Sequence, residues 1–381
     1  MSLTAPATIT QEPLSSGVIK RATIMADGRD LIYFDDAGSS LPPERPADAR
    51  DLPPRPPTAT MRLDPLSGEW ISIATSRQTR VMLPPKHLDP LAPSTPQNQS
   101  EVPGDYDVVV FENRSPSFGP EPGEILTAPA EPSVSIGATS PSVGRCEVVC
   151  FAPESDGAFS SLPVARIRTI VEAWADRTAA LSAVPGVEQV FVFENRGEAS
   201  GGTLHHPHAQ LCAYPFVTPR TRALLRSIES HGPGFFDELL AFEQAGERVL
   251  VRGEHFTAYV PFAARWPLEI HVLPHRHIPD LAATNEAERD ELAELLPRLT
   301  GALDRLYDSP TPYIAAWHQA PVRHGRDDVR LQLQLQSPRR GADRLKFTAG
   351  SEAAMGAFIG DVAPEASAAA LRAVLENEGA N

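Results

Sequence analysis

A row of alternating polar side chains marks the middle of the chain, in the run His206–Gln210, which reads His-Pro-His-Ala-Gln. In an extended chain every second residue points to the same side, so His206, His208 and Gln210 are predicted to share one face of a strand. A Gly/Ser loop precedes the run, and its pair Gly201–Gly202 lets backbone amides approach a ligand closely. The chain must therefore contain a β-sheet that presents imidazoles and an amide in a row.

This row suits phosphoryl-type transfer. A neutral imidazole is a competent nucleophile near neutral pH, because its unperturbed pKa is about 6.5. Its other nitrogen must then be held by an acceptor such as a backbone carbonyl. Covalent attack splits one difficult displacement into two easier ones, and an amide can donate to a phosphoryl oxygen as charge builds there. We interpret His208 as the nucleophile and Gln210 as that amide.

Two other interpretations of the row stay open. Alternating histidines on a strand suit zinc when one or two further ligands are present. A surface cluster without chemistry is the other alternative. His205 is predicted to point to the opposite face, and we assign it no role.

The charge balance and the apolar segments limit the partners. The 381 residues carry a net charge of −15, and no basic run exceeds Arg339-Arg340, which argues against a nucleic-acid partner. No stretch approaches the roughly 18 apolar residues of a membrane helix. Residues 1–16 lack the pattern of a secretory signal. We therefore predict a cytoplasmic protein that has no membrane partner.

The cysteine content agrees with that compartment. Three cysteines, Cys146, Cys150 and Cys212, in a chain of this length indicate reduced thiols and not a disulfide framework. Cys146 and Cys150 share one face of a predicted strand, and packing in the core is favoured over metal binding.

The chain is predicted to be an α+β protein with antiparallel sheets, because strands, a helix and more strands occur twice in succession. Residues 1–60 are Pro-rich and predict an arm that packs on the body or on a partner subunit, with one edge strand at 30–35. The folded core is expected from Met61, with halves at 61–218 and 219–381. Helices are predicted at 163–181 and 284–306. Strands are predicted at 69–73, 106–111, 145–151, 189–193, 208–214, 247–251, 256–260, 268–273, 313–317 and 329–336.

Several separated segments resemble the galactose-1-phosphate uridylyltransferases, which belong to the histidine-triad superfamily. Besides His206–Gln210, the segments that carry this resemblance are Arg62–Trp70, Phe193–Gly197, Trp266–Glu269, Trp317–Pro321 and Lys346–Glu352. The likeness runs from about Met61 to Val362. It implies two histidine-triad-like halves, each an antiparallel sheet flanked by helices, assembled as a homodimer.

The resemblance also implies roles. His208 would take a uridylyl group from UDP-glucose and pass it to a second sugar 1-phosphate, expected to be galactose 1-phosphate, without any external cofactor. Gln210 would contact the transferred phosphoryl. The implied substrate-binding residues are Arg77 and Arg80 for phosphates, Asn113, Asn195 and Thr203 for the uridine and its phosphates, and Lys346, Phe347, Ala349, Gly350 and Glu352 for the sugar phosphate, across the subunit interface. A solvated loop is the alternative for the two arginines, and turn positions are the alternative for the two asparagines.

The chain departs from the family at a zinc site that many members build from a Cys-x-x-Cys pair and two histidines. The matching stretch, Asp89–Ala92, has no thiol, and the third ligand position falls near Ser155. Only His206 remains, so we predict no metal there and expect His206 to shape the loop. An ion held by His87, Asp89 and His206 stays an alternative.

A second family metal site, built from a Glu and three histidines, is also altered. His318 survives, but the His-x-His strand reads Gln332-Leu333-Gln334. Neutral amides are poor ligands for a transition metal, so no metal is predicted here either.

Two further changes leave the acceptor sugar open. Ala209 stands where Gly is usual, and Phe358 stands about where some members have a sugar-binding Gln. A related nucleotidyltransferase, or a nucleotide-sugar phosphorylase for another sugar 1-phosphate, is the alternative function. A non-catalytic nucleotide-binding protein is a third hypothesis, which the intact His208 and Gln210 disfavour.

Overall fold

One long antiparallel sheet runs through the chain. The computed structural model describes residues 8–55, 57–78, 82–119 and 136–378. These form a 12-stranded sheet in the order β1-β2-β3-β6-β8-β10-β9-β14-β15-β13-β12-β11, which confirms the α+β prediction. Its strands are β1 Thr10–Pro13, β2 Ile19–Ile24, β3 Asp30–Asp35, β6 Val108–Glu112, β8 Arg145–Cys150, β9 Gln189–Arg196, β10 His208–Tyr214, β11 Val249–Arg252, β12 Phe256–Tyr259, β13 Leu268–Pro274, β14 Tyr313–His318 and β15 Gln332–Ser337.

Two small sheets, five α-helices and several short helical turns complete the described part of the chain. The small sheets pair β5 Glu69–Ile73, β4 Thr60–Asp64 and β7 Thr139–Pro141, and β16 Arg339–Gly341 with β17 Arg344–Leu345. The helices are α1 Val164–Ser182, α2 Pro219–His231, α3 Phe235–Ala245, α4 Glu286–Arg305 and α5 Pro364–Glu378. No helix of the described residues is both long and apolar enough to cross a membrane.

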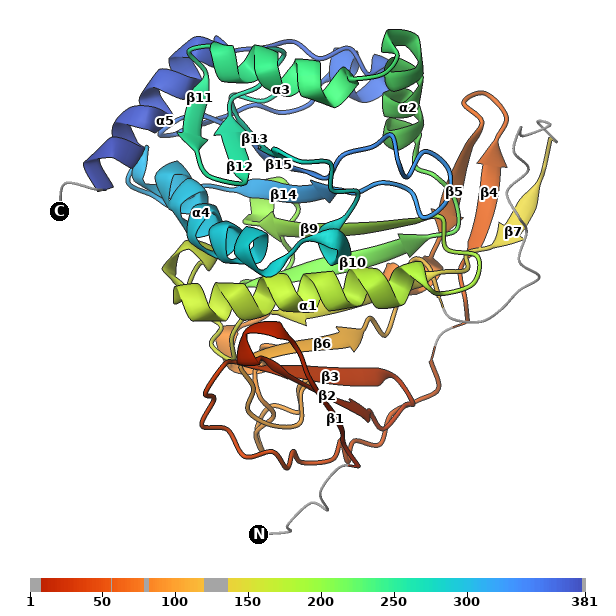
Figure 1. Cartoon of the computed structure of the whole chain (residues 1–381). Coiled ribbons are helices and arrows are strands. Elements are labelled where there is room, and N and C mark those ends of the chain that lie inside the picture. The colour runs from red at the N-terminus through yellow and green to blue at the C-terminus, as the bar shows by residue number, and fades with distance from the viewer. Residues whose placement is uncertain (1–7, 56, 79–81, 120–135, 379–381) are drawn as a thin grey trace.

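The two predicted halves meet where β9 pairs with β14, so their sheets are continuous. Ala316 of β14 lies opposite Phe193 of β9, which in turn lies opposite Gln210 of β10. Helices α1 and α4 lie side by side across one face of this joint sheet (Figure 1). The division at 218/219 stays a prediction, because the sheet itself shows no break there.

Helices α1 and α4 form where the periodicity predicts them. The α1 side chains Ile167, Ile170, Val171 and Trp174 are buried against the sheet, as expected for one apolar helix face. Helix α4 begins after Asn285, whose side chain accepts from the Glu288 amide while Glu288 returns a bond to Asn285, a capping box.

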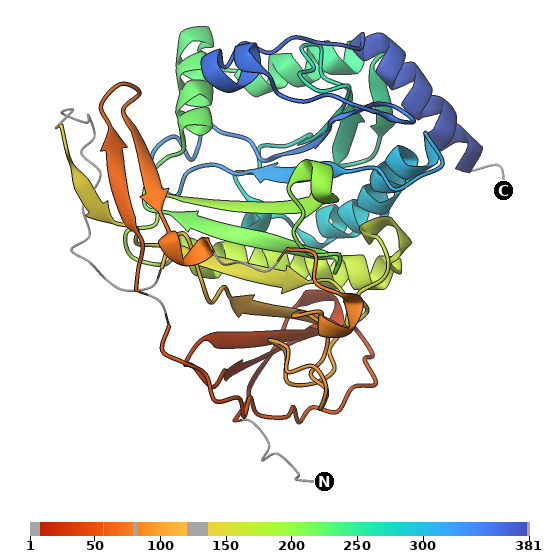
Figure 2. The same ribbon diagram turned by 180° about the vertical axis from the view of Figure 1, so that it is seen from behind.

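The catalytic candidates lie on the other face of the sheet. Along β10, Ala209, Leu211 and Ala213 are buried in the core beneath α1, so His208 and Gln210 point away from the helices. The loops of the N-terminal half gather on this second face, which is turned toward the viewer in Figure 2.

The cysteines also follow the prediction. Cys146 and Cys150 are buried, and all three thiols are free. Burial raises the pKa of the Cys150 thiol well above its usual range, which keeps it protonated. Cys146 lies opposite Cys212 across β8 and β10, with the two sulfurs 3.5 Å apart.

The N-terminal 60 residues differ from the expectation. Strand β3 matches the strand predicted at 30–35, but it is not an edge, because β2 pairs on one side of it and β6 on the other. Val18, Ile32 and Phe34 are buried in the main core, so the folded core begins well before Met61. Strands β1 and β2 were not expected because neither shows an apolar alternation: β1 is exposed along its whole length, and the buried side chains of β2 are Arg21 and Thr23.

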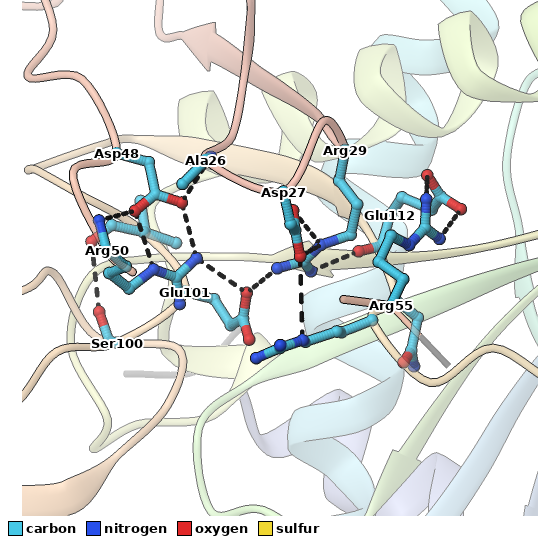
Figure 3. A network of polar contacts seen from close by, with 12 residues as sticks. Ala26, Asp27, Arg29, Asp48, Arg50, Arg55, Ser100, Glu101 and Glu112 are labelled. Carbon is cyan, nitrogen blue, oxygen red and sulfur yellow. Dashed lines mark hydrogen bonds and ion pairs between the residues drawn. The ribbon is translucent and has the colours of Figure 1, made fainter. Parts of the chain in front are cut away.

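A buried ion network ties this N-terminal part to the rest of the chain (Figure 3). Arg29, with 0% exposure, donates to Asp27 at 2.8 Å, to Glu101 at 2.6 Å and to the Glu112 carbonyl at 2.8 Å. Arg50 also contacts Glu101, at 3.3 Å. Because Glu101 belongs to the long loop before β6, the network fixes that loop against β2 and β3.

Replacing Arg29 by Met should therefore destabilise the protein. Loss of the guanidinium leaves carboxylates and a carbonyl buried without their donor, and breaking such a pair costs about 3 kcal/mol. We expect denaturant unfolding to show this loss. Lys86→Ala is the control, because the Lys86–Asp156 pair is 64% and 73% exposed, and it should change stability by less than about 0.5 kcal/mol. Equal effects of the two variants would contradict the assignment.

Candidate active site

A pocket of about 280 Å³ surrounds the motif at the start of β10. Its walls come from the motif itself, from the end of β9 and from the Gly-rich loop between these strands. The lining residues include Glu194, Asn195, Arg196, Glu198, Gly202, His205, His206 and His208. His205 thus lies at the pocket, although it was assigned no role.

His208 has a defined tautomer. Its Nδ1 lies 2.8 Å from the carbonyl oxygen of His206, and because a carbonyl only accepts, Nδ1 carries the proton. In the neutral ring the lone pair is then on Nε2. This is the backbone acceptor that the chemistry of a nucleophilic histidine requires.

His206 itself lies in the loop before the strand, because β10 begins at His208. The predicted row on the strand therefore contains His208 and Gln210 but not His206. The His206 ring is buried, with Nδ1 2.7 Å from Asp89 Oδ2 and Nε2 2.8 Å from the Ala152 carbonyl. Burial raises the pKa of Asp89, but hydrogen bonds and charge from His206 outweigh it, so the pKa of Asp89 lies below its usual range.

Two predicted site residues lie beside His208 on the same face. Gln210 follows two positions later on β10. Ala209 pairs with Glu194, so continuing the antiparallel register by one residue places Asn195 opposite His208. Asn195 also lines the pocket.

The loop that carries Arg77 reaches the same region. Leu83 donates its amide to the Thr203 carbonyl at 2.8 Å, which ties this loop to the Gly-rich loop. Arg77 ends the short helix η2 Thr75–Arg77. Hydrogen bonding between the two thiols lowers the pKa of Cys146 and raises the pKa of Cys212, and the charge of Arg77 is a smaller effect that acts to lower the pKa of both. Arg77 therefore lies near the Cys212 end of β10. Arg80 lies outside the described residues.

Asn113 behaves as a turn residue. Its side-chain oxygen accepts from the Ser115 amide at 2.9 Å, and Asn113 is not among the residues that line the pocket. The contacts therefore favour a turn position for Asn113 over a role in binding uridine.

The segment Lys346–Glu352 is separate from the pocket, since none of its residues lines it. Lys346 is buried and lies 3.1 Å from Asp361 and 3.5 Å from Glu352. Phe347 is 76% exposed. Ala349 precedes the short helix η7 Gly350–Ala354, which contains Gly350 and Glu352. One chain does not bring these side chains to His208.

An arginine lies at the position where the resemblance implies a second metal site. The Arg220 guanidinium donates to Gln334 at 2.7 Å, and the Gln334 amide donates to Gln332 at 3.0 Å. His318 lies opposite Gln332. Burial, and next the charge of Arg220, lower the pKa of His318 to about 3. A fixed cation beside a neutral histidine and two amides does not suit a divalent ion.

Glu194 is a buried carboxyl that sequence reasoning did not single out. Burial raises its pKa to about 7, against a smaller opposing effect of the hydrogen bond from Tyr313. Tyr313 donates to Glu194 at 3.1 Å, and Arg196 beside it pairs with Asp304 at 2.7 Å.

Within the described part of the chain, no group of three or more His, Cys, Asp or Glu side chains could hold a metal ion.

Both halves of the chain match known proteins of one family. Residues 56–218 match the family model "Galactose-1-phosphate uridyl transferase, N-terminal domain", and residues 229–378 match the corresponding C-terminal domain. The galactose-1-phosphate uridylyltransferase of Streptomyces lividans is 41% identical over 84% of this chain and 87% of its own length. The Thermotoga maritima protein of the same name is 35% identical over 82% of this chain and 97% of its own length.

Solved structures have the same fold. A uridylyltransferase structure superposes with a TM-score of 0.73 at 30% identity, covering 84% of this chain and 99% of that chain. An ADP-glucose phosphorylase from Arabidopsis thaliana, solved with ADP-glucose bound, gives 0.60 at 22% identity over 82% and 98%. At that identity the second likeness concerns the fold alone.

Glu194→Gln should change the pH dependence of stability. A carboxyl whose pKa is about 7 in the folded chain and 4.5 in the unfolded chain holds its proton more tightly when folded, so stability falls as pH rises through that window. Gln cannot ionise, and its carbonyl can still accept from Tyr313. The free energy of unfolding of the variant should gain on the wild type between those two pH values and run parallel to it outside them. The exposed Glu198→Gln is the control, and equal profiles for both variants would refute the assignment.

Proposed function

The chain belongs to the galactose-1-phosphate uridyl transferase family and is a nucleotidyltransferase, and on that premise we propose that it exchanges UMP between UDP-glucose and galactose 1-phosphate through a uridylyl group on His208. The observation that carries this proposal is the hydrogen bond from His208 Nδ1 to the His206 carbonyl. It leaves the Nε2 lone pair to act as the nucleophile.

In the first half-reaction, His208 Nε2 attacks the α-phosphorus of UDP-glucose. The Nε2–P bond forms, the P–O bond to glucose 1-phosphate breaks, and glucose 1-phosphate leaves. In the second half-reaction the phosphate oxygen of galactose 1-phosphate attacks the same phosphorus and releases His208. Each displacement is in line, so the protein contributes mainly position and charge neutralisation.

The neighbours of His208 fit these two steps. Gln210, on the same face of β10, can donate to an oxygen of the transferred phosphoryl. Asn195 and the Gly-rich loop with Thr203 are assigned to the uridine and its phosphates, and Arg77 is assigned to phosphate charge. The position of Asn195 opposite His208 supports its assignment. The hydrogen bond from the Leu83 amide to the Thr203 carbonyl supports the others, because it ties the loop after Arg77 to the Gly-rich loop.

We also propose a homodimer in which the segment Lys346–Glu352 of one subunit completes the pocket of the other. The support is that this segment lines no part of the His208 pocket of its own chain, while Phe347 and the nearby Met355 are 76% and 81% exposed. With Phe358 and Ile359, which are 40% and 59% exposed, they form a group of exposed apolar side chains, as expected for an interaction surface. The free thiols are consistent with a reducing, cytoplasmic location.

The covalent step predicts a labelled protein. After incubation with UDP-glucose labelled in the uridylyl group, followed by denaturation, wild-type protein should retain about one acid-labile label per chain. His208→Gly should retain none, while His205→Gly, which changes an exposed histidine of the same pocket, should be labelled like the wild type. Wild-type protein that retains no label, or label that persists in His208→Gly, refutes the proposal. Release of the label by a panel of sugar 1-phosphates then identifies the acceptor.

The shared pocket predicts complementation between two inactive variants. Mixed subunits carrying His208→Gly and Phe347→Ala should recover turnover, because one of the two pockets in each heterodimer then combines an intact His208 with an intact Phe347. Each variant alone should stay below about a tenth of wild-type kcat/KM. If the mixture is no more active than the sum of its parts, the segment acts within its own chain.

A further inference from the structure

Three hydrogen bonds meet at the buried ring of His206. Asp89 Oδ2 lies 2.7 Å from Nδ1, and the Ala152 carbonyl lies 2.8 Å from Nε2. The Tyr106 hydroxyl is 3.1 Å from Nε2 and gives its own proton to the Leu91 carbonyl at 2.8 Å. All three oxygens are therefore placed to accept from ring N–H groups of His206. The ring is held from both sides, with a carboxylate at Nδ1.

This arrangement does not fit the zinc that many family members hold at His206. A metal ligand needs a ring nitrogen with a lone pair, whereas both nitrogens here donate to oxygen. The partners are one carboxylate, one carbonyl and one phenol, and the second oxygen of Asp89 accepts from the Leu91 amide at 2.9 Å. His87, which we left open as a further ligand, is exposed on the short helix η3 Lys86–Leu88.

We propose that Asp89 is a positioning residue for catalysis: its hydrogen bond to Nδ1 holds the His206 ring, and so fixes the carbonyl that sets the tautomer of His208. This inference rests on the proposed function of His208 as the nucleophile. The chain of contacts is short, because His206 bonds to Asp89 through its ring and to His208 through its backbone. The ion pair takes the place of the metal as the fixed point beneath the catalytic loop.

Asp89 can serve as a fixed point because its own loop is held. Asn98 donates to the Asp89 carbonyl at 2.7 Å, and the Glu101 amide donates to the Pro90 carbonyl at 2.8 Å. Glu101 is the residue that receives Arg29 from the N-terminal strands, at 2.6 Å (Figure 3). The segment with β2 and β3 thus braces the loop that carries Asp89. This segment lies before residue 56, where the family match begins.

Asp89→Asn tests the charge with the smallest change of shape. The two Asp89 oxygens accept from Leu91 and from His206, so an amide nitrogen at either place meets a donor. One of the two contacts is then lost, or the ring of His206 turns. We expect kcat for uridylylation by UDP-glucose to fall about 10- to 100-fold, the usual effect of losing a partner that orients an active-site ligand, with KM within about twofold of wild type.

Asp107→Asn is the matched control. Asp107 is a comparably buried carboxylate, 13% exposed against 6% for Asp89, and it accepts from Arg166 and Asp36, not from His206. This variant should keep the wild-type kcat. A loss of the same size in both variants, or no loss in Asp89→Asn, overturns the proposal.

A readout that does not depend on turnover is ¹⁵N NMR of histidine-labelled protein, with His206 identified by its absence in His206→Asn. At neutral pH the wild type should show protons on both ring nitrogens, and Asp89→Asn should show one. A single ring proton in the wild type overturns the proposed role of Asp89 in positioning His206, whatever the activity. If the wild type shows two ring protons but forms no adduct, the proposed function fails and the positioning role of Asp89 stands.

The same protein settles the alternative of a metal. Purified full-length enzyme should contain less than about a tenth of an equivalent of zinc, and its uridylylation rate should survive a chelator. A rate that falls with the chelator and returns with added zinc would contradict the assignment of an ion pair at this position.

Discussion

The hydrogen bond from His208 Nδ1 to the His206 carbonyl is the contact on which the rest of this site depends. It selects which ring nitrogen can attack, and it needs the loop before β10 to stay in place. The continuous sheet fixes His208, since β10 pairs with β8 and β9 on its two sides. Before β10 the backbone bond from the Phe151 amide to the Pro207 carbonyl holds the loop at 3.2 Å, and the side chain of His206 anchors it further.

A buried ion pair is a costly way to hold a loop, because both charges must leave water. The pair is maintained here because every polar atom around it has a partner: Leu91 satisfies the second oxygen of Asp89, and Ala152 accepts from the far side of the His206 ring. At the position where the resemblance implied a second metal site, Arg220 bonded to Gln334 supplies a fixed positive charge. In both places the described side chains connect to one another without needing an ion.

Much of the fold follows from local pattern. The strands at 189–193 and 208–214 and the helix at 163–181 were predictable because alternation and helical periodicity are properties of short segments. His208 and Gln210 were predictable for the same reason. Strands β1 and β2 were not expected, since β1 is fully exposed and the buried positions of β2 are the polar Arg21 and Thr23. Strand β3 lies inside the sheet because β2 covers the edge that β3 would otherwise form. The partners of His206 and Glu194 were missed because they are distant in the chain: Asp89 is separated from His206 by 117 residues, and Tyr313 from Glu194 by 119.

The position of phosphorus on the His208 ring tests this account most directly. After reaction with UDP-glucose, the adduct can be digested to its peptide and the two phosphoramidate isomers distinguished by ³¹P NMR. A tautomer set by the His206 carbonyl predicts that the Nε2–P isomer is formed. An Nδ1–P bond would mean that Nδ1 is not held by that carbonyl when the enzyme reacts, and it would contradict the account.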